Sequence, residues 1–194
     1  SDGAVAASSG GSILYRADQS VALTFLDAGA GNAAIISSSG DLTDNDSTDD
    51  LDLRSAALAL HAANGIGTGA NPLETETGTL AAAAGSGGIF ILEADSVTID
   101  DVAVTVDAVA VDGSAAALSV GPQSDLVTGA GSDGTISLRT AAGGGGTITL
   151  NDGTATGAGR ALSADGSGNV YLGADADLQV NTRLNAGTGH ITLE

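Results

Sequence analysis

Gly168-Asn169-Val170-Tyr171-Leu172 is followed later in the chain by a second copy of the same pattern, Gly189-His190-Ile191-Thr192-Leu193. In each copy, a glycine and a polar residue precede three residues with strand character. Successive side chains of a strand point to opposite faces, so the first and third of these three residues share one face. That face is aliphatic in both copies. The repeat therefore predicts short strands that each bury one aliphatic face.

The same unit occurs at four earlier places in the chain: Gly11–Tyr15, Gly88–Leu92, Gly134–Leu138 and Gly146–Leu150. Once insertions are allowed for, the spacing is roughly 20 residues, which is typical of one turn of a β-solenoid. A single turn cannot bury its own inner face, and stacking of successive turns does so. We therefore predict an all-β protein, a parallel β-solenoid of the right-handed β-helix type. Residues 1–194 would form one solenoid segment of roughly nine coils, with about 20–22 residues per coil and loop insertions.

The apolar composition supports a narrow interior. Aromatic residues make up only 2% of the chain although hydrophobic residues make up 42%, and 30 residues are glycine. Because protein interiors pack to crystal-like density, a wide core with so few bulky side chains would contain voids. A core only a few side chains across is filled well by Ala, Val, Ile and Leu. The composition thus favours a thin stack over a rounded globule.

Two segments define the expected strand phase. In Leu53–Ala63 the leucines at 58 and 60 alternate, which predicts a strand in spite of the alanine content. In Val97–Gly113 the apolar alternation changes phase at Asp100-Asp101 and again at Asp107-Ala108. Asp tolerates turn conformations and bonds to its own backbone, so both phase changes are predicted to be solenoid corners.

The charge excludes several classes of partner. Twenty-four acidic residues stand against five arginines and no lysine, a formal net charge of −19. Nucleic-acid binding needs basic groups against phosphate, so this field has the wrong sign. No apolar run approaches the ~20 residues of a membrane helix, and membrane insertion is not expected.

The absence of cysteine excludes disulfides and thiolate metal sites. Because residue 1 is serine, we expect a processed chain or a segment of a longer or polymerised protein.

A family resemblance is carried by the order of four segments: Gly67–Thr75, Thr79–Ala82, Gly88–Ile91 and Val97–Ile99. This order, with the later Gly-Thr-Ile-Thr-Leu and Gly-His-Ile-Thr-Leu units, resembles filamentous-haemagglutinin-like exoproteins and giant repetitive bacterial surface proteins. The resemblance implies a secreted right-handed β-helix on the bacterial cell surface or outside the cell, acting as an adhesin, fibre or stalk. It carries over no catalytic residue.

The segment 41–52 is too polar to line a core and is predicted to be an Asp-rich loop that projects from the stack. Its carboxylates and Asn45 supply several hard oxygens, the ligands that calcium prefers. We take Asp44, Asp46, Asp49 and Asp50 as candidate calcium ligands. The spacing lacks the central glycine and terminal glutamate of an EF-hand, so a solvated acidic loop without metal is the alternative.

Catalytic signals are weak. His61 and His190 are the only imidazoles, and no Gly-x-Ser-x-Gly motif accompanies them. We therefore expect no enzyme and no cofactor apart from the candidate calcium. The expected function is a structural or adhesive repeat segment that stacks with copies of itself or with adjacent repeats. The alternative is a β-helix that binds or cleaves polysaccharides, which a lateral groove combining arginine, acidic and aromatic side chains would distinguish.

Overall fold

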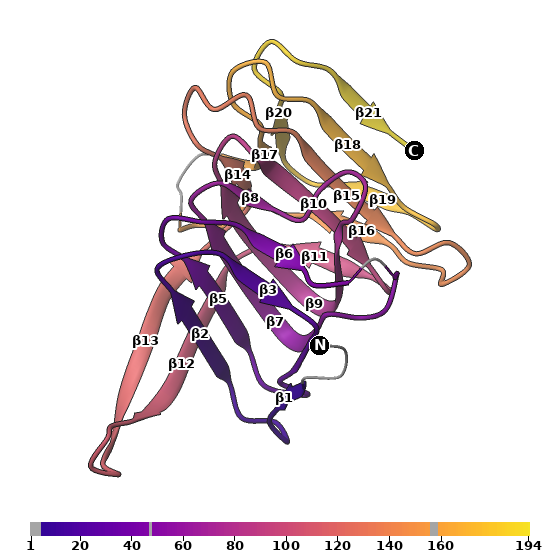
Figure 1. Cartoon of the computed structure of the whole chain (residues 1–194). Coiled ribbons are helices and arrows are strands. Elements are labelled where there is room, and N and C mark those ends of the chain that lie inside the picture. The colour runs from indigo at the N-terminus through magenta and orange to yellow at the C-terminus, as the bar shows by residue number, and fades with distance from the viewer. Residues whose placement is uncertain (1–4, 47, 156–158) are drawn as a thin grey trace.

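The computed structural model describes residues 5–46, 48–155 and 159–194, and these residues form 21 strands and no helix. Nineteen strands belong to one sheet, in which every pairing is parallel, and the other two form an antiparallel hairpin. Since there is no helix among the described residues, none is long and apolar enough to cross a membrane. The predicted fold class is confirmed: the strands pair with their equivalents one coil away, as in a β-solenoid (Figure 1).

The strands stack in three ladders. Ladder I contains β2 (Ile13–Ala17), β5 (Ala33–Ser37), β7 (Leu53–Ala62), β9 (Leu73–Ala84), β14 (Leu126–Thr128), β17 (Arg160–Ser163) and β20 (Arg183–Asn185). Ladder II contains β3 (Val21–Leu23), β6 (Leu42–Asp44), β8 (Gly65–Ile66), β10 (Gly88–Glu93), β15 (Ile136–Thr140), β18 (Val170–Gly173) and β21 (Ile191–Leu193). Ladder III begins with β1 (Val5–Ala7), β4 (Phe25–Asp27) and the first parts of β7 and β9, and the start of β9 then pairs with the end of β10. It continues with β11 (Val97–Ile99), which pairs with Thr79 and Leu80 in the second half of β9, and with β16 (Ile148–Leu150) and β19 (Leu178–Val180).

Ladders I and II each hold seven strands, so the described chain makes about seven coils and not the nine expected from length. Insertions take up the remaining residues. Val170 pairs with Ile191, as the repeat predicts, and Ile136 pairs with Val170 across a longer coil. At the N-terminal end, Ile13 pairs with Ala33, so the first coil is slightly shorter than the last one.

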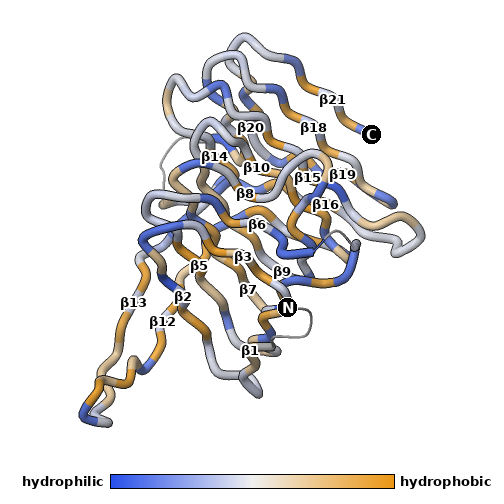
Figure 2. The backbone as a smooth tube through the Cα atoms, viewed as in Figure 1, coloured by the Kyte–Doolittle hydropathy of each residue, from blue (hydrophilic) through white to orange (hydrophobic). Residues whose placement is uncertain are grey.

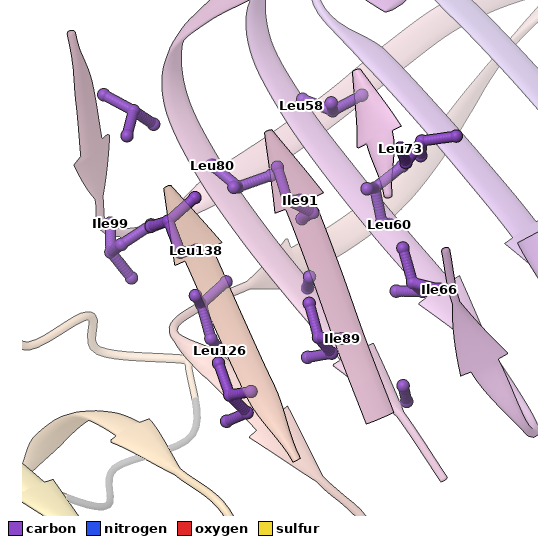
Figure 3. Close-up of a cluster of buried hydrophobic side chains, with 14 of the residues drawn as sticks. Leu58, Leu60, Ile66, Leu73, Leu80, Ile89, Ile91, Ile99, Leu126 and Leu138 are labelled. Carbon is purple, nitrogen blue, oxygen red and sulfur yellow. The ribbon is translucent and has the colours of Figure 1, made fainter. Parts of the chain in front are cut away.

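The core is a narrow aliphatic column between the ladders. In ladder II, the inward residues Leu42, Ile66, Ile89, Ile136 and Val170 follow one another in register, and all are buried. Figure 3 shows how leucines and isoleucines from successive strands meet in this interior. None of the four aromatic side chains belongs to the buried set. The alternation predicted for Ile148 and Leu150 is also confirmed, since both are buried and Thr149 between them is partly exposed.

The largest departure from a plain solenoid is the hairpin of β12 (Val102–Val109) and β13 (Ala115–Gln123). It leaves the stack after β11 and projects from it (Figure 1). The predicted corner at Asp100-Asp101 lies between β11 and β12, but Asp107-Ala108 lies inside β12, so the second predicted corner is wrong. The hairpin turns at Asp112-Gly113, where Gly113 has a φ of 82° and the Asp112 carboxylate accepts the Ser114 N–H. Apolar and polar residues alternate with the same period in a hairpin strand and in a solenoid strand, so the alternation could not distinguish a hairpin from a coil.

The Asp-rich segment 41–52 was predicted from the sequence to project from the stack as a loop, but both of its ends lie in the stack. Its first part is β6, which pairs with β3 and β8, and Leu42 is fully buried. Asp52, at its other end, is 1% exposed and its carbonyl accepts the Leu26 N–H. Of the described residues that follow β6 in this segment, 45, 46 and 48–51 belong to no strand. Burial of Leu42 and the backbone pairing of β6 keep the first part of this segment in the stack.

Candidate functional site

Three carboxylates from neighbouring parts of the stack meet beside this segment. Asp44 is the last residue of β6, Asp52 immediately precedes β7, and Glu74 is the second residue of β9. One oxygen of each lies within 4.8 Å of one oxygen of each other. The register explains the approach: Leu53 pairs with Thr75, so the residues that precede them, Asp52 and Glu74, sit side by side on adjacent coils. We call Asp44, Asp52 and Glu74 the carboxylate triad.

The triad is buried and short of hydrogen-bond donors. Asp44 is 9% exposed and Glu74 is 4% exposed. The Asp46 N–H donates to Asp44 Oδ1 at 2.9 Å, and the Glu74 N–H donates to Asp52 Oδ2 at 3.1 Å. Asp44 Oδ2 and both carboxylate oxygens of Glu74 accept no hydrogen bond from an N–H or hydroxyl group, although the Asp52 carboxyl group, when protonated, can donate to Glu74. Buried polar groups are normally hydrogen-bonded, so three orphan oxygens in one place require an explanation.

Burial disfavours the charged form of these acids. It raises the pKa of Asp52 to about 9, assisted by its contact with Glu74, and it also raises the pKa of Glu74. The negative charges of Asp44 and Asp49 act on Glu74 in the same direction. The triad can therefore either hold protons or hold a cation that compensates its charge.

Of the candidate calcium ligands expected from the sequence, Asp44 belongs to the triad and the other three lie outside it. Asp49 and Asp50 are exposed, and Asp46 Oδ1 accepts hydrogen bonds from the N–H and hydroxyl of Thr48. These bonds lower the pKa of Asp46, as expected of a solvated turn acid. Glu74 was missed because it lies outside the Asp-rich segment. The signal that could have found it is the coil period, since Glu74 lies one coil length after Asp52.

A second buried acid, Glu93, differs from the triad because both of its carboxylate oxygens accept hydrogen bonds. It is fully buried at the end of β10, where the Thr75 hydroxyl donates to one carboxylate oxygen and the Thr77 N–H donates to the other. Burial raises its pKa to about 8. Because both oxygens have donors, Glu93 has a structural role inside the stack.

The outer face of ladder II carries the side chains that could contact a ligand. Phe90, Ser137 and Tyr171 follow one another in register on β10, β15 and β18. Together with Arg139 on β15 they line a shallow surface depression that extends to Thr68 and Pro72. A neighbouring depression is lined by Arg139, Tyr171, Asp175 and Glu194, and the Tyr171 hydroxyl donates to Glu194 at 2.9 Å. An arginine, two acids and two aromatic rings thus share one lateral face.

The two histidines do not form a catalytic set. His61 is exposed on β7 in ladder I, while His190 is exposed immediately before β21 in ladder II. Among the described residues, neither imidazole makes a hydrogen bond to an acid or a hydroxyl. Arg54, which is half-exposed, is engaged with Glu76 at 2.7 Å and with Asp27 at 3.9 Å.

Among the described residues, β21 pairs on one side only, with β18. Ile191 and Leu193 pair with Val170 and Leu172 and occupy the same inward positions. Val170 and Leu172 are at most 1% exposed, whereas Ile191 is 43% and Leu193 is 47% exposed. The last rung therefore presents aliphatic side chains and unpaired backbone groups together, the features of a sheet edge that can accept a further strand.

The parallel ladders and the aliphatic column define the class of this chain: it is an all-β protein with the architecture of a parallel β-solenoid. In comparisons with protein-family models, curated proteins and solved structures, nothing matches this chain.

Proposed function

We propose that this chain is a structural and adhesive segment of a secreted bacterial protein of the cell surface or of an extracellular fibre, and that it is not an enzyme. The expectation of secretion rests on the sequence resemblance to filamentous-haemagglutinin-like proteins. The solenoid fold supports it at the level of architecture, because stacked coils give an elongated, rigid body from short repeats. The histidines and arginines are dispersed, which favours a non-catalytic role.

The observation that carries the proposal is the open edge at β21. Full burial of an isoleucine or leucine side chain contributes about 1.5–3 kcal/mol, and Ile191 and Leu193 leave much of this unrealised. One additional coil of the same kind would cover both side chains and pair the backbone of β21. We propose that this coil comes from adjacent repeats of the same protein or from the opposite end of a second copy.

The stacking proposal is tested by sedimentation velocity over a range of protein concentrations, together with negative-stain imaging. We expect the native chain to form end-to-end assemblies whose population rises with concentration. Ile191→Lys, which places a charge at the inward position of the last rung, should abolish them. The matched control Thr192→Lys adds the same charge at the neighbouring outward position and should leave assembly nearly unchanged. A native chain that sediments as a monomer at every concentration contradicts homotypic stacking.

A second candidate function is glycan binding on the outer face of ladder II. The observation that favours it is the shared depression formed by Phe90, Arg139 and Tyr171. Aromatic rings stack on the apolar faces of sugar rings, and charged and hydroxyl groups beside them orient the sugar hydroxyls. Binding of a soluble polysaccharide set to the native chain and to Tyr171→Ala, measured by calorimetry, tests this function. Equal heats for both proteins would exclude a role for this face.

A further inference from the structure

The carboxylate triad lacks a counter-charge among the described residues. Leu53 separates Asp52 from the nearest arginine in sequence, Arg54, and that guanidinium binds Glu76 and Asp27 on the outer surface. The charged form of a buried carboxylate is costly unless it is paired, hydrogen-bonded or bound to a metal. Asp52 and Glu74 also face each other on adjacent strands, where like charges are destabilising. These carboxylate oxygens therefore mark a place where either a proton or a cation compensates the buried acids.

The donors already present leave a defined set of oxygens for a cation. The backbone N–H groups of Asp46 and Glu74 occupy Asp44 Oδ1 and Asp52 Oδ2. Asp44 Oδ2, Glu74 Oε1 and Glu74 Oε2 remain free, although Glu74 is only 4% exposed. A hydrogen-bonding side chain would be expected at such a position if the acid served the core alone, as Thr75 does for Glu93.

We propose that Asp44, Asp52 and Glu74 bind a calcium ion. The ligands are all hard oxygens, and neither cysteine nor histidine is part of the triad, which favours calcium or magnesium over transition metals. Calcium–oxygen distances are about 2.3–2.6 Å, so two oxygens on one ion are at most about 5 Å apart. The 4.8 Å limit within the triad satisfies this condition. Calcium also accepts irregular geometry and bidentate carboxylates, whereas magnesium requires a near-ideal octahedron.

The position of the triad gives the ion a mechanical role. Asp44 and Asp52 are the two ends of the loop that joins β6 to β7, and Glu74 belongs to the following coil. An ion bound to all three would close the loop at its base and connect two coils. Asn71 already makes one such connection by donating from its side chain to the Asp46 carbonyl at 2.7 Å. The ion would thus stabilise the stack at the point where the polar loop follows β6.

The test is thermal unfolding, followed by circular dichroism at constant ionic strength, in calcium, in magnesium and in chelator, with calorimetric titration of calcium alone. We expect calcium to raise the melting temperature of the native chain by several degrees and to bind with one high-affinity site, with a smaller effect of magnesium. Glu74→Gln should lower the calcium affinity about tenfold or more, because the number of ligand charges sets the affinity of such sites. The same variant should melt above the native chain in chelator, since it removes one of three adjacent buried acids that have no counter-charge among the described residues.

The matched control is Asp50→Asn, which removes from the same loop one exposed charge that does not contribute to the pKa of Glu74. Its calcium response should equal that of the native chain. If Glu74→Gln fails to fold, Asp52→Asn and the stoichiometry of the native chain provide the same test. Equal melting temperatures of the native chain in calcium and chelator overturn the proposal, as does a response that survives in Glu74→Gln and Asp52→Asn but disappears in the loop control. The site does not depend on end-to-end stacking, so either proposal can fail alone.

Discussion

At the scale of single residues, Glu93 shows how a solenoid can accommodate an acid inside its stack. Thr75, directly opposite Glu93 in register, and the backbone of Thr77 together donate to both of its carboxylate oxygens. The donors come from the neighbouring coil, so the acid ties two coils together. Desolvation nevertheless dominates and raises the pKa of Glu93 to about 8.

This shift predicts a pH dependence of stability. The pKa of Glu93 is higher in the folded state than its ordinary value of 4.5, so the folded state holds the proton more tightly. Its stabilising contribution is complete below about pH 4.5 and is lost as the pH rises through about 8. The free energy of unfolding should fall over this window by at most about 1.4 kcal/mol per pH unit for this proton. Denaturant unfolding of the native chain and of Glu93→Gln at several pH values measures it. Identical pH profiles for the two proteins would contradict the assignment.

At Gly88, the first residue of β10, we predict that substitution by alanine greatly lowers the free energy of unfolding. Its φ is +81°, and a Cβ added there would lie 2.4 Å from the Thr135 carbonyl oxygen of the next coil. Gly88→Ala combines an unfavourable backbone conformation with an overlap against backbone, and we expect a loss of about 2 kcal/mol or more. Gly121 in the hairpin has open space around it, so Gly121→Ala should stay within about 0.5 kcal/mol. Chemical denaturation compares the two variants, and equal losses would show that the contact with Thr135 is unimportant.

At the scale of elements, the hairpin is divided into a structural base and a free tip. Its base covers an outward row of alanines on ladder I, where Ala34, Ala59 and Ala81 follow one another in register. Val102 and Val104 pack on this row and form a second, smaller apolar cluster with it. The Gln123 side chain also donates to the Leu60 carbonyl at 2.7 Å. The small alanines allow the hairpin to approach the coil backbone closely.

The tip of the hairpin buries little. Val109 and Val111 are 73% and fully exposed, and Figure 2 shows apolar colour along this projecting end. Replacing residues 107–117 by Asn-Gly would join Val106 to Leu118, which already pair, through a favoured two-residue turn. We expect this deletion to change the free energy of unfolding by less than about 0.5 kcal/mol.

The base should behave in the opposite way. Val104 is 1% exposed, so Val104→Ala should cost about 1–3 kcal/mol through lost burial over the alanine row. The two variants are compared by thermal and chemical unfolding. A tip deletion that destabilises as much as Val104→Ala would mean that the hairpin is stabilised by its full length and not by its base.

At the scale of the whole molecule, charge and stacking act against each other. The net charge of −19 makes every approach of two copies repulsive at long range, while the aliphatic last rung favours contact. Salt screens the repulsion with a Debye length of about 8 Å at physiological ionic strength and leaves hydrophobic contact intact. We therefore predict that added sodium chloride strengthens end-to-end association. Sedimentation at one protein concentration and several salt concentrations measures this, and association that weakens with salt would indicate ion pairing instead.

Much of the fold could be predicted from local pattern. The alternation in Thr147–Leu150 correctly separated the buried Ile148 and Leu150 from the outward threonines, and Leu58 and Leu60 were correctly assigned to a strand, on which both are buried. The hairpin could not be recognised, because Val102, Val104 and Val106 alternate as coil strands do. For the candidate site, Asp44 was among the residues proposed, whereas Glu74 stands in a threonine-rich stretch outside the Asp-rich segment and gives no cluster signal.

By itself, then, the sequence determined the parallel β-solenoid and its narrow aliphatic interior. The reason is that the alternation of apolar and polar residues in each strand, and the glycine before it, are local features that recur in successive coils. The tertiary structure alone decided which strands became neighbours, where the chain left the stack as a hairpin and which acids met. The physical reason is that strand pairing in the ladders joins residues one coil apart, and the lengths of all strands and turns in that coil decide which residues pair. Asp52 therefore lies beside Glu74 only because of the length of the whole coil between them.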